Sequence, residues 1–250
     1  MATADERLAL IRAKVERAEK HINDLDVALR TFLDSNPYLV ARKPHPEGSD
    51  LMVYWLSSAR PIPPLISIIA GDTLANLRGA LDHLAFQLAW LNGARDKRIL
   101  RDTCFPIFDD AASYKSGAKG KIQGMSEAAK ERINACAPYK GGDDALWRLH
   151  RLNNIDKHRL LITVCMFFGS VSSEHAHYIS PSHNAWKPLK AGDVLTVLPT
   201  EYVKDENLHF TFEIAFNELG VAECEPVPKT LRQMAQVVGD TVDSFETLLA

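Results

Sequence analysis

The chain has 250 residues, of which 46% are hydrophobic and 24% charged, and its formal net charge at pH 7 is −3. This length fits one large domain or two small ones, and the composition is that of an ordinary globular protein. The slight acidic excess gives no global attraction to nucleic acid or membranes. The N-terminus is charged, and no run approaches the ~20 apolar residues that a membrane span needs.

The four cysteines, Cys104, Cys136, Cys165 and Cys224, are far apart in the sequence. Their spacing forms neither a zinc knuckle nor a redox pair, so a reduced, cytoplasmic protein is expected. Cys165 lies in an apolar run that favours a buried strand, and we expect its thiol to be inert there.

Residues 4–34 carry apolar side chains at alternating spacings of three and four, from Leu8 to Phe32. This pattern predicts one long amphipathic helix. Two packings are compatible with it. A helix packed antiparallel on another helix of the same chain is favoured, because globular proteins often use this pattern, and the alternative is a coiled coil between two copies.

The next part of the chain is expected to be mainly helical, with breaks at prolines and glycines. In order, the sequence predicts a proline-containing loop (36–48), a strand (50–57), a second long helix (64–92), an extended segment (104–110), a basic loop (114–124), a short helix (126–136) and a third strong helix (capped by Asp143 or Asp144 and running to Arg159).

The character of the sequence then changes to alternating patterns typical of strands. Strands are expected at 160–168, 175–180, 193–199, 209–217 and 221–226, and a last helix at 228–248. Helices followed by a run of strands indicate an α+β fold, in which a long-helix bundle packs with a small antiparallel meander and a C-terminal helix. We expect a single domain over 1–250, with a mainly helical part (1–160), a sheet (161–227) and the last helix (228–250).

The second long helix carries polar residues on an apolar background. Asp72, Asn76, His83 and Gln87 form a polar stripe at helical spacing, and Gly79 lies on it. A glycine inside a helix costs about 1 kcal/mol relative to alanine. We expect a close approach to the backbone at this glycine to be the reason for it. Arg78 and Asp82 stand four residues apart and can form an ion pair.

The third helix places Asp156 on its core-facing stripe, where a carboxylate needs a partner. Arg78 or His83 is the natural one. Trp147, Asn154 and His158 share the neighbouring face. These groups predict either a buried polar network that fastens two helices, or a site between the helices. In the second case the arginine would hold an anion and a histidine would act as acid or base.

A metal site was weighed as a further alternative. His83, His150, His158, Asp82 and Asp156 supply suitable ligand types, and His175 and His177 would share one strand face. However, neither a His-Glu-x-x-His motif nor the Glu-x-x-His pair of di-iron bundles is present. No metal or cofactor is therefore predicted.

The stretches LRGALDHL (77–84) and LNNIDKHR (152–159) are similar to segments of a broad group of uncharacterised bacterial proteins. The FPIF segment (105–108) and the Pro138-Tyr139 step share this likeness. The spacing from Arg78 to His83 also resembles that of the HEPN superfamily, which contains helical ribonucleases and nucleotide-binding domains. The resemblance implies metal-independent RNA cleavage, in which Arg78 stabilises phosphate charge and His83 serves as acid or base.

The leading hypothesis is a HEPN-like ribonuclease with a polar site between the second and third long helices. Its expected catalytic residues are Arg78, His83, Asp156 and His158, and its expected binding residues are Asn76, Asp82, Asn154, Lys157 and Arg159. The expected partners are RNA or a nucleotide, and a second copy of the chain bound through the N-terminal or second helix, with no membrane. The alternatives are a non-catalytic binding module and a metal-dependent hydrolase.

Overall fold

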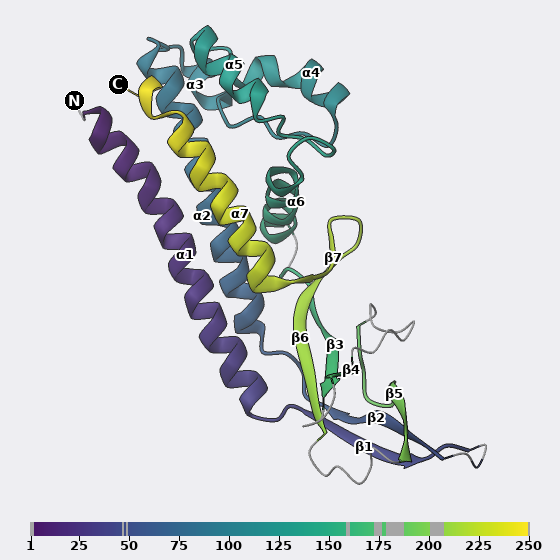
Figure 1. The fold of residues 1–250 in the computed structure, drawn as a ribbon. Coiled ribbons are helices and arrows are strands. Elements are labelled where there is room, and N and C mark those ends of the chain that lie inside the picture. The colour runs from purple at the N-terminus through teal and green to yellow at the C-terminus, as the bar shows by residue number, and fades with distance from the viewer. Residues whose placement is uncertain are drawn as a thin grey trace. The chain divides into compact units, whose positions relative to one another are not determined.

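The computed structural model describes residues 3–46, 48, 50–158, 161–172, 177–178, 188–200 and 208–249. They form the expected α+β fold with a C-terminal helix (Figure 1). The elements in chain order are α1 (Ala4–Asp34), β1 (Tyr38–Pro44), β2 (Leu51–Ala59), α2 (Pro64–Leu91), α3 (Lys97–Asp102), α4 (Ala111–Lys121), α5 (Glu127–Ala135), α6 (Asp144–His158), β3 (Val164–Ser172), β4 (His177–Tyr178), β5 (Val194–Pro199), β6 (His209–Glu218), β7 (Ala222–Pro226), α7 (Val227–Ser244) and a 3₁₀ turn, η2 (Glu246–Leu248).

The chain divides into two compact units, each assembled from separate stretches of sequence. Unit 1 consists of Met1–Leu25, Ile68–Ile162 and Pro228–Ala250, and unit 2 consists of Asp26–Ser67 and Thr163–Val227. Unit 1 contains helices and the candidate site, whereas unit 2 contains the strands. No helix among the described residues is both long enough and apolar enough to cross a membrane.

The apolar seam of α1 is buried within the chain itself. Val15 on this seam faces Gly239 of α7, where an added Cβ would lie 4.0 Å from Val15 Cγ1. Arg12 pairs with Asp243, one turn further along α7, at 2.7 Å. These contacts run in opposite directions along the two helices, which lie side by side in Figure 1. The favoured prediction of antiparallel packing within one chain is confirmed.

Unit 2 contains two sheets, with strand orders β1-β2-β5 and β4-β3-β6-β7. The rings of Tyr38 and Tyr54, from the first sheet, contact those of Phe212 and Phe210, from the second, at centroid distances of 5.1 and 5.5 Å. Aromatic side chains therefore pack the sheets together. The prediction of one C-terminal meander is wrong in this detail, because β5 pairs with β2 rather than with its neighbours in sequence.

Two predicted loops are regular elements. Residues 38–44 form the edge strand β1, where Pro44 is tolerated because an edge strand leaves one side of its backbone unpaired. Residues 111–121 form α4, whose first turn is capped by the Asp110 carboxylate through the Ser113 N–H. One glycine of this segment, Gly117, is needed for packing, because a Cβ there would lie 2.4 Å from the Phe108 ring.

The two glycines of α2 have different surroundings. An added Cβ at Gly79 would meet nothing within 4 Å, so the expected close approach at this position is wrong. The close approach occurs two turns earlier, at Gly71, where a Cβ would lie 2.5 Å from Asp156 Oδ1. Gly71 thus lets the Asp156 carboxylate of α6 lie directly against the backbone of α2.

This contrast predicts opposite effects for the same substitution. Gly79→Ala should stabilise the protein by up to about 1 kcal/mol through helix propensity. Gly71→Ala should be destabilising, because the new methyl group collides with Asp156, and the two variants should differ by at least about 1 kcal/mol. Urea denaturation of both variants measures this difference. Equal stabilisation by the two substitutions would contradict the account, and Gly71→Ala combined with Asp156→Ala should recover stability.

Candidate functional site

A buried arginine in the middle of α2 organises the site. Arg78 is only 6% exposed. Its Nη2 donates to the Asp82 carboxylate and to the backbone carbonyl of Phe105, each at 2.7 Å. Asp82 Oδ1 also accepts the backbone N–H of Phe105 at 3.1 Å. The predicted Arg78–Asp82 pair is confirmed. The two side chains hold both polar backbone groups of Phe105, and we call this arrangement the Phe105 clamp.

The clamp fixes the extended segment 104–109 against α2, and a pocket of about 440 Å³ opens beside it. We call this hollow the Arg78 pocket. It is lined by Arg78, by residues 104–109, by Ser113 and Lys121 of α4, and by His150 and Arg151 of α6. The pocket therefore borders both α2 and α6, the two helices between which the sequence predicts a site.

Two lining residues carry buried nitrogen atoms that have no hydrogen-bond partner among the described residues: Arg78 Nη1 and His150 Nδ1. The side-chain nitrogen of Asn154, Nδ2, lies 3.0 Å from His150 Nε2. An amide nitrogen can only donate a hydrogen bond. Nε2 is therefore the acceptor, and a neutral ring must carry its proton on Nδ1. Both unpartnered atoms are thus hydrogen-bond donors, and both lack an acceptor.

His150 is neutral at physiological pH. Burial lowers the pKa of its imidazole to about 4, and the nearby positive charge of Arg78 adds to this effect. Arg151 and Lys157 act in the same direction, while the Asp109 carboxylate opposes them. A ring that cannot easily take a second proton supplies a fixed N–H donor, but it is a poor general acid near pH 7.

The charged side chains around the pocket are mostly cationic. The described lining contains three cations, Arg78, Lys121 and Arg151, and one carboxylate, Asp109. The net charge stays positive even when Asp82, the ion-pair partner of Arg78, is included. Asp109 Oδ1 accepts a hydrogen bond from the Trp147 indole at 3.2 Å and lies 3.5 Å from Arg151 Nη1. The indole of a buried tryptophan thereby fixes the orientation of this carboxylate.

Of the four predicted catalytic residues, only Arg78 lines the pocket. His83 is exposed and lines a separate hollow of about 520 Å³ together with Arg7 and Leu10 of α1. Asp156 lies against Gly71, where burial and the charge of Asp72 raise its pKa. His158 is exposed at the end of α6. The expected gathering of these groups, with Arg78 or His83 as the partner of Asp156, is not found.

The predicted binding residues do not lie together in one site either. Asn76 donates to the Asp72 carbonyl of its own helix, and Lys157 is exposed. Asp82 belongs to the Phe105 clamp, and Asn154 orients His150 behind the pocket. Arg159 lies outside the described residues.

Sequence reasoning did not select His150, Arg151 or Asp109 for this site. The spacing of His150 and Asn154, four residues apart on α6, was a usable signal, because such pairs share one helix face. Asp109 had none, because its role depends on Trp147, which lies 38 positions away in the chain.

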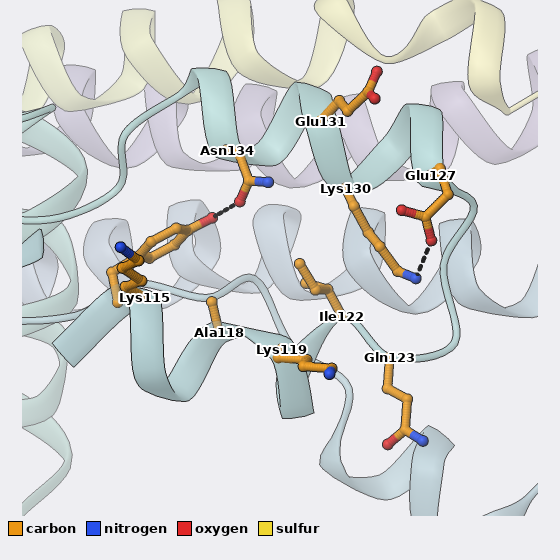
Figure 2. A pocket seen from close by; sticks show the side chains of 10 residues that line it. Lys115, Ala118, Lys119, Ile122, Gln123, Glu127, Lys130, Glu131 and Asn134 are labelled. Carbon is orange, nitrogen blue, oxygen red and sulfur yellow. Dashed lines mark hydrogen bonds and ion pairs between the residues drawn. The ribbon is translucent and has the colours of Figure 1, made fainter. Parts of the chain in front are cut away.

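A larger hollow of about 560 Å³ lies between α4 and α5 (Figure 2). Two pairs of its polar groups bond to one another: Lys130 donates to Glu127 at 2.7 Å, and the Tyr114 hydroxyl donates to Asn134 at 2.7 Å. None of the described residues that line it carries a buried polar side-chain atom without a partner. Size alone therefore does not make it the better candidate.

Comparisons with protein-family models, curated proteins and solved structures gave no significant match. The likeness to HEPN proteins thus stays a sequence-based expectation. Within the described part of the chain, no three histidine, cysteine, aspartate or glutamate side chains are grouped as a metal site would require. His175, which entered the metal hypothesis, lies outside that part. The four cysteines form no disulfide, and burial raises the pKa of the Cys165 thiol to about 12, as an inert core thiol requires.

The clamp predicts a graded response at Asp82. Asp82→Ala should destabilise the protein by about 2 kcal/mol, because it leaves the Phe105 N–H without its acceptor and the buried Arg78 without its opposite charge. Asp82→Asn keeps an acceptor but loses the charge, so it should cost roughly half as much. Glu127→Ala, which breaks the more exposed pair with Lys130, should change stability by less than about 0.5 kcal/mol. Chemical denaturation checks the order, and equal effects at Asp82 and Glu127 would contradict it.

The buried His150 ring predicts a pH dependence of stability. The unfolded ring has a pKa near 6.5. The folded ring has a pKa of about 4, so the unfolded state binds more protons between these values. Stability from the neutral ring is complete above about pH 6.5 and is lost as the pH falls towards 4, by roughly 3 kcal/mol at most.

Denaturation of the wild type and of His150→Gln between pH 4 and 7 measures this contribution. The variant should show a flatter profile than the wild type over this range. His83→Gln, which removes an exposed histidine outside the pocket, is the matched control. Parallel profiles for the wild type and His150→Gln would show that His150 does not titrate as a buried neutral group.

Proposed function

We propose that this protein binds a ligand through a phosphate group held in the Arg78 pocket. The observation that carries the proposal is a pair of buried, unpartnered donors, Arg78 Nη1 and His150 Nδ1, that belong to two residues lining one positively charged pocket. A buried donor without an acceptor costs about 1–3 kcal/mol. An anionic ligand removes that cost, and it is itself held by charge-assisted hydrogen bonds.

A tetrahedral oxyanion fits this donor set better than a planar carboxylate. The donors come from three elements: Arg78 from α2, Lys121 from α4, and His150 with Arg151 from α6. Donors from separate directions suit a group whose oxygen atoms point to the corners of a tetrahedron. A phosphate monoester also carries a charge of about −1.5 to −2 at pH 7, compared with the single charge of a carboxylate.

This function belongs to the class of binding modules, and it is compatible with a nucleotide, one of the expected partners. It does not use His83, which lines another hollow. RNA cleavage by Arg78 and His83, and a homodimer formed through α1 or α2, stay predictions from the sequence.

Calorimetric titration of the purified protein with methyl phosphate tests the proposal. Lys121→Gln and Arg151→Gln should each weaken binding about fivefold, because each removes a partly exposed charge worth roughly 1 kcal/mol. Neither side chain takes part in the Phe105 clamp, so the folded structure should persist. Methyl phosphate should bind more tightly than acetate.

Exposed residues of α1 provide matched controls. Arg17→Gln and Lys20→Gln make the same changes of charge outside the pocket and should leave the affinity unchanged. Binding that responds equally to all four substitutions would show a diffuse electrostatic effect and contradict the proposal. Absence of methyl phosphate binding would also overturn it.

A further inference from the structure

The Arg78 pocket is larger than a phosphate group needs. Its volume of about 440 Å³ falls in the range of roughly 300–1,000 Å³ that is typical of pockets for small organic ligands. Pro106 and Phe108 line it beside the cationic groups. A phosphate at Arg78 and His150 therefore leaves room for an organic body against these apolar side chains.

Asp109 is the one carboxylate among the described residues that line the pocket. A site for an anion alone would not need a negative charge in its lining. Both of its hydrogen-bond and ion-pair contacts, to Trp147 and to Arg151, use Oδ1. The second oxygen, Oδ2, accepts no hydrogen bond from the described residues. The Asp109 side chain is 62% exposed, so this oxygen is open to a ligand. A carboxylate beside a phosphate site repels the phosphate, unless another part of the ligand donates a hydrogen bond to it.

The surroundings of Asp109 select the kind of donor. An ammonium group would interact favourably with the carboxylate, but Arg151 Nη1 already lies 3.5 Å from Asp109 Oδ1 and would repel a second cation there. A neutral hydroxyl group donates to Oδ2 without this repulsion. Hydroxyl groups bound to carboxylates also form short, strong hydrogen bonds.

We propose that the ligand is a small phosphomonoester of a hydroxylated carbon skeleton, such as a sugar phosphate, with its phosphate at Arg78 and His150 and a hydroxyl group donated to Asp109. This inference rests on the proposed phosphate site and adds the identity of the organic part. The ligand is bound without any covalent change.

The test compares ligands that share a phosphate and differ in the rest. Ethyl phosphate lacks a donor, glycerol 3-phosphate and ribose 5-phosphate carry hydroxyl groups, and phosphoethanolamine carries an ammonium group. Titration calorimetry with the full chain should show that at least one hydroxylated ester binds about tenfold more tightly than ethyl phosphate. Phosphoethanolamine should gain no comparable advantage. A stronger gain for phosphoethanolamine would overturn the assignment of a hydroxyl group.

Substitution of Asp109 separates the hydroxyl contact from the phosphate contact. Asp109→Ala should abolish the preference for the hydroxylated ester while leaving ethyl phosphate binding equal or tighter, because the repelling charge is removed. Asp109→Asn retains an acceptor for Trp147 and should reduce the preference without loss of structure. Asp102→Ala removes a nearby exposed carboxylate outside the pocket and should keep the full preference.

The outcomes also distinguish this inference from the proposed function. If ethyl phosphate binds and depends on Lys121 and Arg151, but no hydroxylated ester binds more tightly, the phosphate site stands and the hydroxyl assignment falls. The assignment likewise falls if the preference survives in both Asp109 variants. If no phosphate ester binds, both proposals fall.

Discussion

The burial of the Arg78 guanidinium is the constraint on which the site depends. A charged group with so little exposure is expensive unless it is paired and hydrogen-bonded. Asp82 provides the opposite charge and the Phe105 carbonyl provides a second acceptor, but both use Nη2. Asp82 therefore balances the charge, but Nη1 is left without a hydrogen-bond partner among the described residues, in a side chain that lines the pocket.

The pocket follows from this arrangement. The Phe105 clamp fixes the extended segment 104–109, and Gly117 lets the Phe108 ring pack closely on α4. The same segment presents Asp109 to Trp147 of α6. A set of short-range contacts thus brings three elements around one hollow, although the residues that line it span more than 70 positions in the sequence. Rigid positioning of this kind is what a binding site requires, because the donors are placed before the ligand arrives.

The sequence predicted the long helices well because their periodic apolar residues report burial directly. It predicted neither β1 nor α4. Edge residues such as Arg42 and Lys43 do not alternate between buried and exposed, and the glycines and lysines of α4 are typical of loops. In the site, Arg78 and Asp82 stood out as polar residues on an apolar helix, four residues apart. His150 could have been selected from its spacing to Asn154 on one helix, whereas Asp109 could not, because its role depends on Trp147 of another element. The prediction that Asp156 pairs with Arg78 or His83 failed because helical periodicity shows on which face of its helix a side chain lies. It does not show which residue of a neighbouring helix packs against that face.

The most direct test of the account is a crystal structure of the protein grown with tungstate, an electron-dense analogue of phosphate that anomalous scattering locates without ambiguity. The account predicts a tungstate ion in the Arg78 pocket, within hydrogen-bond distance of Arg78 Nη1 and His150 Nδ1. It would be contradicted by a structure in which a side chain of the protein occupies that position and accepts from both donors, or in which tungstate binds elsewhere and leaves the pocket empty.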